Sequence, residues 1–522
     1  MTLEKSLTKY FGHKEFRYPQ KQIIEDSITK KDQVVILPTG SGKSVCYQLP
    51  ALLQKGITIV VSPLKSLILD QVANLEKNNI KSYALYGDTK ISERRLILDT
   101  MVLKEFTSNI IYTTPETLET NEEFIENLKL LSECSRLTRF VIDEAHCISL
   151  WGNDFRSSYR RLGTLKYTFP NIPIMALTAT ATLRVRKDTI HLLQLNKPEI
   201  YTISYFRPNL IIDVKPRVKT QSLQEIIVMI QSKYSNDSGI IYCLSRKQCD
   251  ELAELLQQND ISCDSYHAGL VSSKRTMIQE KWQEGNVKVI VATIAFGMGI
   301  DKDNVRYVIH YNMPFSLENY YQEIGRAGRD GKPSECILYY SYQDKICAER
   351  LIRLKNNVEK SENYIKHQVD KLTSMLHYAE NIEDCRHCQI SNYLGEPRLY
   401  DTDHCNNSCN NCKKRDQLIK VDVTDIVINI FNSIMKSERP SKTNIEKLFK
   451  KSSNYKYLLQ KYRSLQRLMY IYKRSFVYLI VNKYIKETFI RTKSGYWREH
   501  YQLFAKSKSV IEKKTLIKIN MI

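Results

Sequence analysis

Short apolar runs alternate with longer, helix-like segments between about residues 20 and 200. The clearest runs are residues 34–37, 57–61, 110–112, 140–142 and 174–177. They are short and rich in β-branched residues, which is typical of buried strands. Strands that alternate with helices predict a parallel sheet covered by helices, so we expect an α/β fold for this part of the chain.

A second series of the same kind follows Arg207-Pro208, which reads as a linker because the residue before a proline avoids helical conformation. Its strand-like runs lie near residues 239–242, 287–291 and 306–309. We therefore expect two α/β lobes, over residues 1–205 and 206–345, with a cleft between them that can open and close.

The pattern changes near residue 422. An amphipathic helix is predicted to begin at 422–424, with further helices as far as Leu468. Two strand-like runs follow, residues 476–481 and 489–501, and Lys493-Ser494-Gly495 within the second is suited to a hairpin turn. Helices followed by a hairpin predict a winged helix over residues 416–510, with a tail over 511–522.

Charge is distributed unevenly along the chain. The net charge is +21, but residues 413–522 hold 26 lysines and arginines against 8 acidic residues, a net of +18. A lysine-rich composition would raise lysine everywhere and does not explain this asymmetry. The C-terminal region is therefore expected to bind a polyanion such as DNA.

Length and composition limit the remaining possibilities. A chain of 522 residues has room for roughly three or four domains. It shows neither an apolar run long enough for a bilayer nor a signal-peptide core, so we expect an intracellular protein without membrane contact. The compartment would be the nucleus in a eukaryotic host, and the cytoplasm or nucleoid in a bacterium.

A glycine-rich loop lies directly between the first strand-like run and a helix-like segment over residues 45–53. Strand, glycine loop, lysine, hydroxyl and helix is the arrangement that cradles phosphates. The lysine would reach the β- and γ-phosphates of ATP, and the serine hydroxyl would bind Mg²⁺. The general pattern has a glycine where Leu37 stands. The candidate nucleotide-binding residues here are Thr39, Gly40, Ser41, Gly42, Lys43 and Ser44.

Adjacent carboxylates follow the strand-like run at 140–142. Asp143 is placed to hold Mg²⁺, and Glu144 to orient and deprotonate an attacking water. Two arginines, Arg326 and Arg329, are expected on one helical face, from which both could approach a γ-phosphate. These four residues and Lys43 are the candidate catalytic set.

Five of the thirteen cysteines fall between residues 385 and 412, a clustering that indicates metal ligation rather than disulfides. Cys385, Cys405, Cys409 and Cys412 would form a closed tetrahedral site for structural zinc within a helical subdomain over residues 346–415. Cys388 is a fifth candidate, and His387 or His404 could replace a thiolate.

The motifs resemble those of a known family. PTGSGKS at 38–44, DEAH at 143–146 and TAT at 178–180 are similar to superfamily-two helicases. FGHKEFRYPQKQII from residue 11, SPLKSLILDQV from residue 62 and DEAHCISLWGNDFR from residue 143 resemble the RecQ DNA helicases. The resemblance implies two RecA-like lobes, a zinc subdomain and a winged helix. It implies 3′→5′ unwinding of DNA driven by ATP, in repair, recombination or replication.

The resemblance also assigns individual roles. Phe16, Arg17 and Gln20 would read adenine, Arg329 would be the arginine finger with Arg326 as its partner, and Tyr393 to Glu396 favour Cys385 over Cys388 as ligand. Residues 242–246 and 267–269 would touch the DNA backbone. The residues expected to couple DNA to hydrolysis, or to separate strands, are Trp151, Phe155, Arg156, Thr178, Thr180, Tyr496 and Trp497. Packing in the core is the alternative for the aromatic residues.

The sequence departs from the family where Leu150, Asn153 and Ser157 replace a usual glutamine, histidine and proline. Lost hydrogen bonds there could loosen the coupling between DNA and hydrolysis. A translocase that separates strands poorly is therefore one alternative. A DNA-binding protein with a decayed motor is another, although Lys43 and Glu144 are both present.

Overall fold

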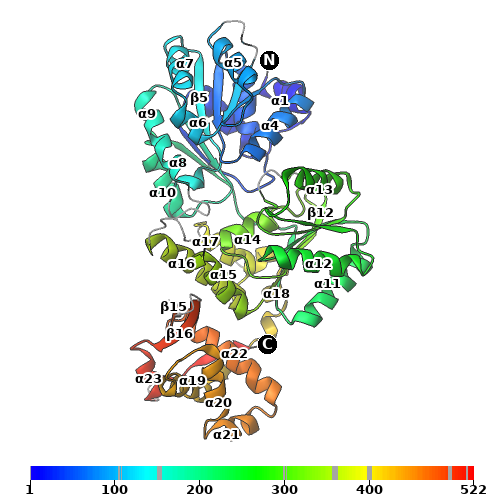
Figure 1. Cartoon of the computed structure of the whole chain (residues 1–522), viewed down its shortest axis with the longest axis vertical. Coiled ribbons are helices and arrows are strands. Elements are labelled where there is room, and N and C mark those ends of the chain that lie inside the picture. Colours follow the sequence, from blue (N-terminus) through cyan, green and yellow to red (C-terminus); the bar gives the residue numbers. More distant parts are fainter. Residues whose placement is uncertain are drawn as a thin grey trace.

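The computed structural model describes residues 2–521, except 104, 105, 107, 150–155, 298, 299, 301, 355–361, 397–401, 492–496, 513 and 514. Two α/β lobes and a C-terminal region follow one another along the long axis of the molecule (Figure 1). In the described part of the chain, no helix combines the length and apolar character needed to cross a membrane.

The first lobe is built on a seven-stranded parallel sheet with the order β3-β4-β2-β5-β6-β1-β7. The five central strands coincide with the five predicted runs, and their residues are buried because helices cover both faces. The strands are β1 (Gln33–Ile36), β2 (Ile57–Val61), β3 (Tyr83–Leu85), β4 (Ile110–Thr113), β5 (Leu137–Ile142), β6 (Ile174–Thr178) and β7 (Glu199–Thr202). The helices are α1 (Leu3–Phe11), α2 (Gln20–Ile28), α3 (Val45–Leu53), α4 (Lys65–Lys77), α5 (Ile91–Thr100), α6 (Pro115–Thr120), α7 (Glu122–Glu133), α8 (Ser157–Arg160), α9 (Thr164–Thr168) and α10 (Leu183–Leu192).

The second lobe repeats this plan with a six-stranded parallel sheet, β10-β11-β9-β12-β13-β8. The three predicted runs correspond to β9, β11 and β12. The strands are β8 (Leu210–Pro216), β9 (Ser238–Tyr242), β10 (Cys263–Tyr266), β11 (Val289–Ala292), β12 (Val305–His310) and β13 (Ser334–Tyr340). The helices are α11 (Lys219–Lys233), α12 (Arg246–Gln257), α13 (Ser272–Glu284), α14 (Leu317–Ile324) and α15 (Tyr342–Leu354).

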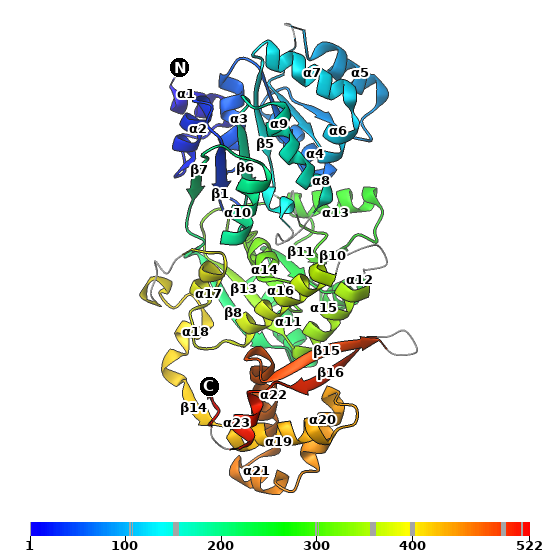
Figure 2. The same ribbon diagram turned by 90° about the vertical axis from the view of Figure 1, so that its left-hand side faces the viewer.

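A helical segment with the cysteine cluster lies against the second lobe, and its last helix leads toward the C-terminal region (Figure 2). It contains α16 (Glu362–Glu380), α17 (Arg386–Tyr393) and α18 (Asn410–Lys413). The edge strand β8 is tied to this segment, because the backbone N–H of Ile212 donates to the carbonyl of Ser408 at 2.9 Å. The cluster is therefore held against the sheet of the second lobe.

The C-terminal region packs helices against a hairpin, and its assignment as a winged helix stays a prediction. Its elements are β14 (Ile419–Asp422), α19 (Thr424–Lys436), α20 (Lys442–Lys450), α21 (Tyr455–Lys461), α22 (Leu465–Val481), β15 (Ile485–Arg491), β16 (Trp497–Leu503), α23 (Ser507–Ile511) and β17 (Lys518–Met521). β17 pairs antiparallel with β14, so the last described residues form a strand that closes this region rather than a separate tail.

One predicted strand is wrong. Residues 476–481 form the last turns of α22, and the hairpin consists of β15 and β16. Leu468, Ile471, Tyr472, Phe476 and Leu479 are all buried in this helix. This spacing of three and four residues gives a continuous apolar helical face, and packing of that face outweighs the strand propensity of the short run.

Candidate functional site

The glycine-rich loop lies at the C-terminal end of β1 and leads into α3. Gly40 and Gly42 have φ angles of +82° and +79°, a region that residues with a side chain rarely adopt. A Cβ atom on Gly42 would also lie 2.5 Å from Nε2 of Gln20. The loop therefore needs glycine at both positions, for conformation at the first and for both conformation and space at the second.

The amine of Lys43 lies inside this loop. Its Nζ donates to the carbonyl oxygens of Leu37 at 3.0 Å and Pro38 at 3.3 Å. Burial lowers the pKa of Lys43, while the carboxylates of Glu144 and Asp143 oppose that shift. The amine of Lys43 thus lies close to the loop carbonyls and to the carboxylates of Asp143 and Glu144. An anion bound in the loop would form an ion pair with this amine.

Asp143 and Glu144 follow β5 at the same edge of the sheet. Burial raises the pKa of Asp143 to about 7, and the adjacent Glu144 carboxylate adds to the shift. Burial also opposes ionisation of Glu144, but His146, whose Nδ1 lies 3.2 Å from its Oε2, and Lys43 together lower the pKa of Glu144. The pKa values of these neighbouring carboxyl groups are thus shifted in opposite directions: Glu144 is held ionised, while Asp143 retains a proton more readily than a free carboxyl group.

Arg326 and Arg329 reach this edge from the second lobe, but not from one helical face as predicted. α14 ends at Ile324, and both arginines lie in the turns that follow. Glycines lie at both points where the helix is lost: Gly325 is the residue that directly follows α14, and Gly328, with a φ of +55°, keeps helical conformation from resuming between the two arginines.

The turn after α14 contacts the glycine-rich loop directly. A Cβ atom on Gly40 would lie 3.1 Å from Cγ of Arg329, and one on Gly325 would lie 3.5 Å from Cβ of Thr39. Arg326 is buried and close enough to Glu144 to lower its pKa. The structure therefore brings the five candidate catalytic residues of both lobes to one place.

Arg17 and Gln20 lie against the opposite side of the loop. The Arg17 guanidinium donates to the carbonyl of Gly40 at 2.6 Å, and Nε2 of Gln20 donates to those of Ser41 and Gly42, each at 3.1 Å. Oε1 of Gln20 accepts from the Arg17 backbone N–H at 2.9 Å. Both side chains are thus bonded to the glycine-rich loop, and the Gln20 side chain is also bonded to the Arg17 backbone.

The residues expected to couple DNA to hydrolysis are only partly visible. Leu150, Trp151, Asn153 and Phe155 lie outside the described residues. The Arg156 guanidinium donates to the carbonyl of Pro63, in the loop after β2.

A side-chain hydrogen bond joins the two lobes, and the sequence did not predict it. Nε2 of Gln322, on α14, donates to Oγ1 of Thr180 at 3.1 Å. Oγ1 of Thr178, at the end of β6, lies 2.8 Å from Nδ1 of His146. Gln322 precedes the two arginines in the same motif, and only the folded geometry shows which threonine it meets.

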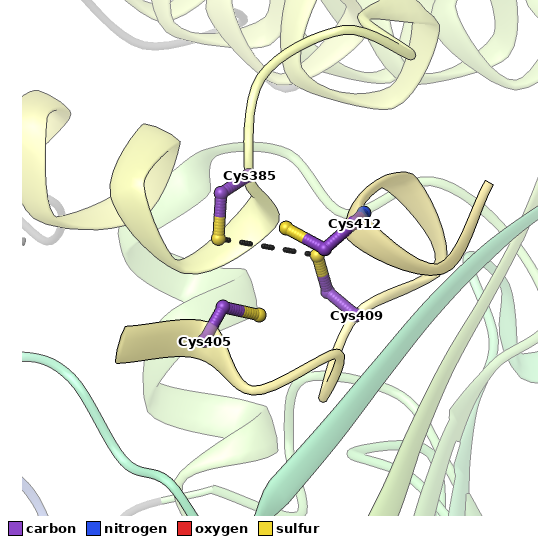
Figure 3. Close-up of side chains that lie close together, drawn as sticks. All are labelled: Cys385, Cys405, Cys409 and Cys412. Carbon is purple, nitrogen blue, oxygen red and sulfur yellow. Dashed lines mark hydrogen bonds between the residues drawn. The ribbon is translucent and has the colours of Figure 1, made fainter. Parts of the chain in front are cut away.

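The four predicted cysteines form a compact group in which all sulfur atoms lie within 4.8 Å of one another (Figure 3). Sγ of Cys409 is 3.9 Å from Sγ of Cys385. Thiolates about 2.3 Å from a zinc ion stand about 3.8 Å apart in a tetrahedron, so the group fits zinc. Cys388 is not part of it, and Nε2 of His387 instead lies 3.1 Å from Oγ of Ser408.

Comparison with known proteins places this geometry in a class. Residues 17–189 match the family model described as DEAD/DEAH box helicase, and residues 218–331 match the helicase conserved C-terminal domain. Residues 342–413 match RecQ zinc-binding. The two lobes and their loops thus define a helicase-type motor with an attached zinc module.

Sequence relatives then give the family. The chain is 44% identical to the RecQ-like DNA helicase BLM of Xenopus laevis over 428 residues, which are 81% of this chain and 31% of the relative. It is 36% identical over 522 residues to the ATP-dependent helicase SGS1 of Saccharomyces cerevisiae, covering 97% and 35%. This chain belongs to the RecQ family of helicases. It spans about a third of the length of these relatives.

Solved structures support the fold. The DUF1998 helicase MrfA bound to DNA has a TM-score of 0.55 at 19% identity, over 72% of this chain and 56% of that one. The Mycobacterium smegmatis helicase Lhr bound to single-stranded DNA and AMP-PNP has a TM-score of 0.53 at 15% identity, over 96% and 78%.

Proposed function

We propose that the chain is an ATP-dependent DNA helicase that moves 3′→5′ along single-stranded DNA and separates duplexes in repair, recombination or replication. The observation that carries this proposal is the contact of Arg329, from the second lobe, with Gly40 in the glycine-rich loop of the first. A γ-phosphate held by that loop would lie between the lobes, so hydrolysis would change how they close.

Each side chain then has a role in hydrolysis. Lys43 binds the β- and γ-phosphates, Glu144 orients the attacking water, and Arg326 and Arg329 stabilise charge in the transition state. Ser44 and Asp143 would hold Mg²⁺, which neutralises phosphate charge when bound. Arg17 and Gln20 would extend the site toward adenine.

The remaining modules would serve DNA and structure. Zinc at the four cysteines has no open position and would be structural. The basic winged helix would bind duplex phosphates. Tyr496 lies outside the described residues, as does the side chain of Trp497; either would serve as the wedge at the hairpin tip. The names of the relatives, DNA helicases, support DNA as the substrate.

A labelled duplex with either a 3′ or a 5′ single-stranded tail tests the proposal, with ATP and Mg²⁺ present and Glu144→Gln as control. Unwinding of the 3′-tailed duplex alone, lost in the variant, is expected. Hydrolysis stimulated by DNA without strand separation would instead indicate a translocase, consistent with Leu150 and Asn153. Lys43→Ala should bind DNA without hydrolysing ATP; continued turnover would overturn the assignment of the loop.

A further inference from the structure

Buried polar side chains join the β15–β16 hairpin to the second lobe. We call Tyr342, Lys345 and Glu349 of α15, with Glu487 of β15 and Tyr501 of β16, the Glu487 cluster. Oε1 of Glu487 accepts from the hydroxyls of Tyr342 at 2.7 Å and Tyr501 at 2.9 Å. Lys345 donates to the other oxygen of Glu487 and, at 2.7 Å, to Glu349. Glu487 therefore satisfies donors from both elements at once.

The cluster is buried and balanced in charge. The side chains of Lys345, Glu349 and Glu487 are each only 3–4% exposed. Although burial favours the neutral amine, the carboxylates of Glu487 and Glu349 raise the pKa of Lys345. Glu349 has a second partner in Arg353, at 2.7 Å. Moving one charged side chain of the Glu487 cluster away from the others would be costly, because it would leave the remaining charges buried without a partner.

The same turn of α15 is fixed to the sheet of the second lobe. Asp344, between Tyr342 and Lys345, is buried and accepts from the side chain of Asn312 at 3.1 Å and from the backbone N–H of Met313 at 3.4 Å. Both residues follow β12. Within one turn of α15, Asp344 thus bonds to the second lobe, while Tyr342 and Lys345 bond to the hairpin.

Contacts continue along the outer part of the hairpin. Arg350 donates to Glu499 of β16 at 2.9 Å, and the Arg353 guanidinium lies 5.3 Å from the ring centre of Phe489. The described strands of the hairpin run beside the second lobe (Figure 2). The contact with α15 therefore runs along both strands, from Glu487 and Tyr501 to Phe489 and Glu499.

We propose that Glu487 is a positioning residue that fixes the hairpin to α15, so that the hairpin moves with the second lobe as the lobes close. This inference rests on the proposed helicase function. In that function, a hairpin tied to the lobe would advance against the duplex with each ATP, whereas a loosely attached one would lag behind hydrolysis.

Glu487→Gln tests the proposal because it keeps the size of the side chain and removes its charge. We expect amides of β15 and β16 to exchange with solvent about tenfold faster, with those of α19 unchanged, in protein without DNA or ATP. Hydrolysis stimulated by single-stranded DNA should stay near the wild-type rate, while base pairs separated per ATP fall about threefold or more.

Glu446→Gln is the matched control, since it removes the same charge from a pair with Lys450 inside α20. Arg350→Gln gives a second variant in case Glu487→Gln does not fold, because Arg350 is 38% exposed and its loss leaves only the partly exposed carboxylate of Glu499 without this partner. It should change exchange and coupling in the same direction, but less.

Two results would overturn the inference. Unchanged exchange in the hairpin would show that Glu487 does not anchor it, and faster exchange with an unchanged number of base pairs per ATP would show that anchoring does not serve coupling. Failure of the proposed function is distinct: wild-type protein would then separate no duplex, while the exchange measurement would still report on the anchor.

Discussion

The carboxyl group of Asp143 makes the site sensitive to pH near neutrality. Its pKa is raised by burial from 3.8 to about 7. Between those values the folded protein binds one proton more than the unfolded chain at this group, so raising the pH through this window removes stability from the metal-free protein. A cation that binds the ionised carboxylate must displace that proton.

We therefore expect the apparent affinity for Mg²⁺ to rise about tenfold per pH unit below pH 7 and to level off above it. Titration of Mg²⁺ at fixed nucleotide concentration, from about pH 5.5 to about pH 8.5, would measure this. Asp143→Asn has no titrating carboxyl there and should give weak, nearly constant affinity. A wild-type affinity that does not depend on pH would contradict the role of Asp143.

Replacing Arg329 should impair ATP hydrolysis without impairing nucleotide binding. Because its side chain packs on Gly40, Arg329→Ala should leave nucleotide binding nearly intact and lower kcat for ATP hydrolysis by about 10³-fold. Arg329→Lys should recover only part of the rate, since an ammonium lacks the planar pair of donors. Single-turnover hydrolysis and binding of a fluorescent nucleotide measure the two effects, and equal losses in both would argue against a finger.

Single residues also show the limit of sequence reasoning about this site. Lys43, Asp143 and Glu144 could be found because strand ends and glycine spacing fix their position locally. The bond from Gln322 to Thr180 could not, since it joins residues 142 apart in different lobes. Its existence depends on how the lobes meet, which no local pattern records.

Among the elements, the short helices α17 and α18 position three of the four cysteines, since Cys385 and Cys409 directly precede them and Cys412 lies in α18. The backbone N–H groups of Arg386 and Cys412 both lie 3.5 Å from Sγ of Cys409 and help to orient it. Hydrogen bonds from Cys385 and Cys405 lower the pKa of Cys409, which favours the thiolate that binds metal.

Zinc analysis of purified variants tests this centre. We expect one zinc ion per wild-type chain, loss of that ion in Cys409→Ser, and retention in Cys388→Ser, which lies outside the group. Because Ser408 accepts from Ile212 of β8, loss of zinc should also speed amide exchange at that strand edge. Zinc lost from Cys388→Ser and kept in Cys409→Ser would reverse the choice of ligands.

Helices and strands were predicted best where a single hydrophobic pattern determines the element. The buried central strands of both lobes follow from apolar runs between helices. α22 was mistaken in part because residues 476–481 are β-branched and aromatic, and only the apolar face that begins at Leu468 shows the helix. The spacing of Arg326 and Arg329 predicts a helical face, but α14 ends at Ile324 and Gly328 between the arginines has a positive φ angle.

At the scale of the whole molecule, the order of modules could be predicted but their contacts could not. Charge asymmetry and the cysteine cluster divided the chain into motor, zinc and basic parts. The pairing of β14 with β17 and the attachment of the hairpin to α15 bring together segments about 100 or more residues apart, and each depends on tertiary packing.

The basic charge of the C-terminal region gives a prediction for the molecule as a whole. Lys447 and Lys451, at the end of α20, are exposed there. If both contact phosphates, Lys447→Gln with Lys451→Gln should lower duplex affinity and reduce the slope of log K against log salt by nearly two, at about 0.9 per phosphate contact. Fluorescence anisotropy over a range of salt concentrations measures the slope.

The matched control is Lys77→Gln with Lys81→Gln, which removes the same charge from two exposed positions of the first lobe, one at the end of α4 and one in the segment between α4 and β3. Because net charge falls equally in both double variants, a change confined to the α20 pair would come from local contact rather than from the overall field. An equal change in both would assign the effect to net charge, and an unchanged slope in the α20 pair would place the duplex on another face of the basic region.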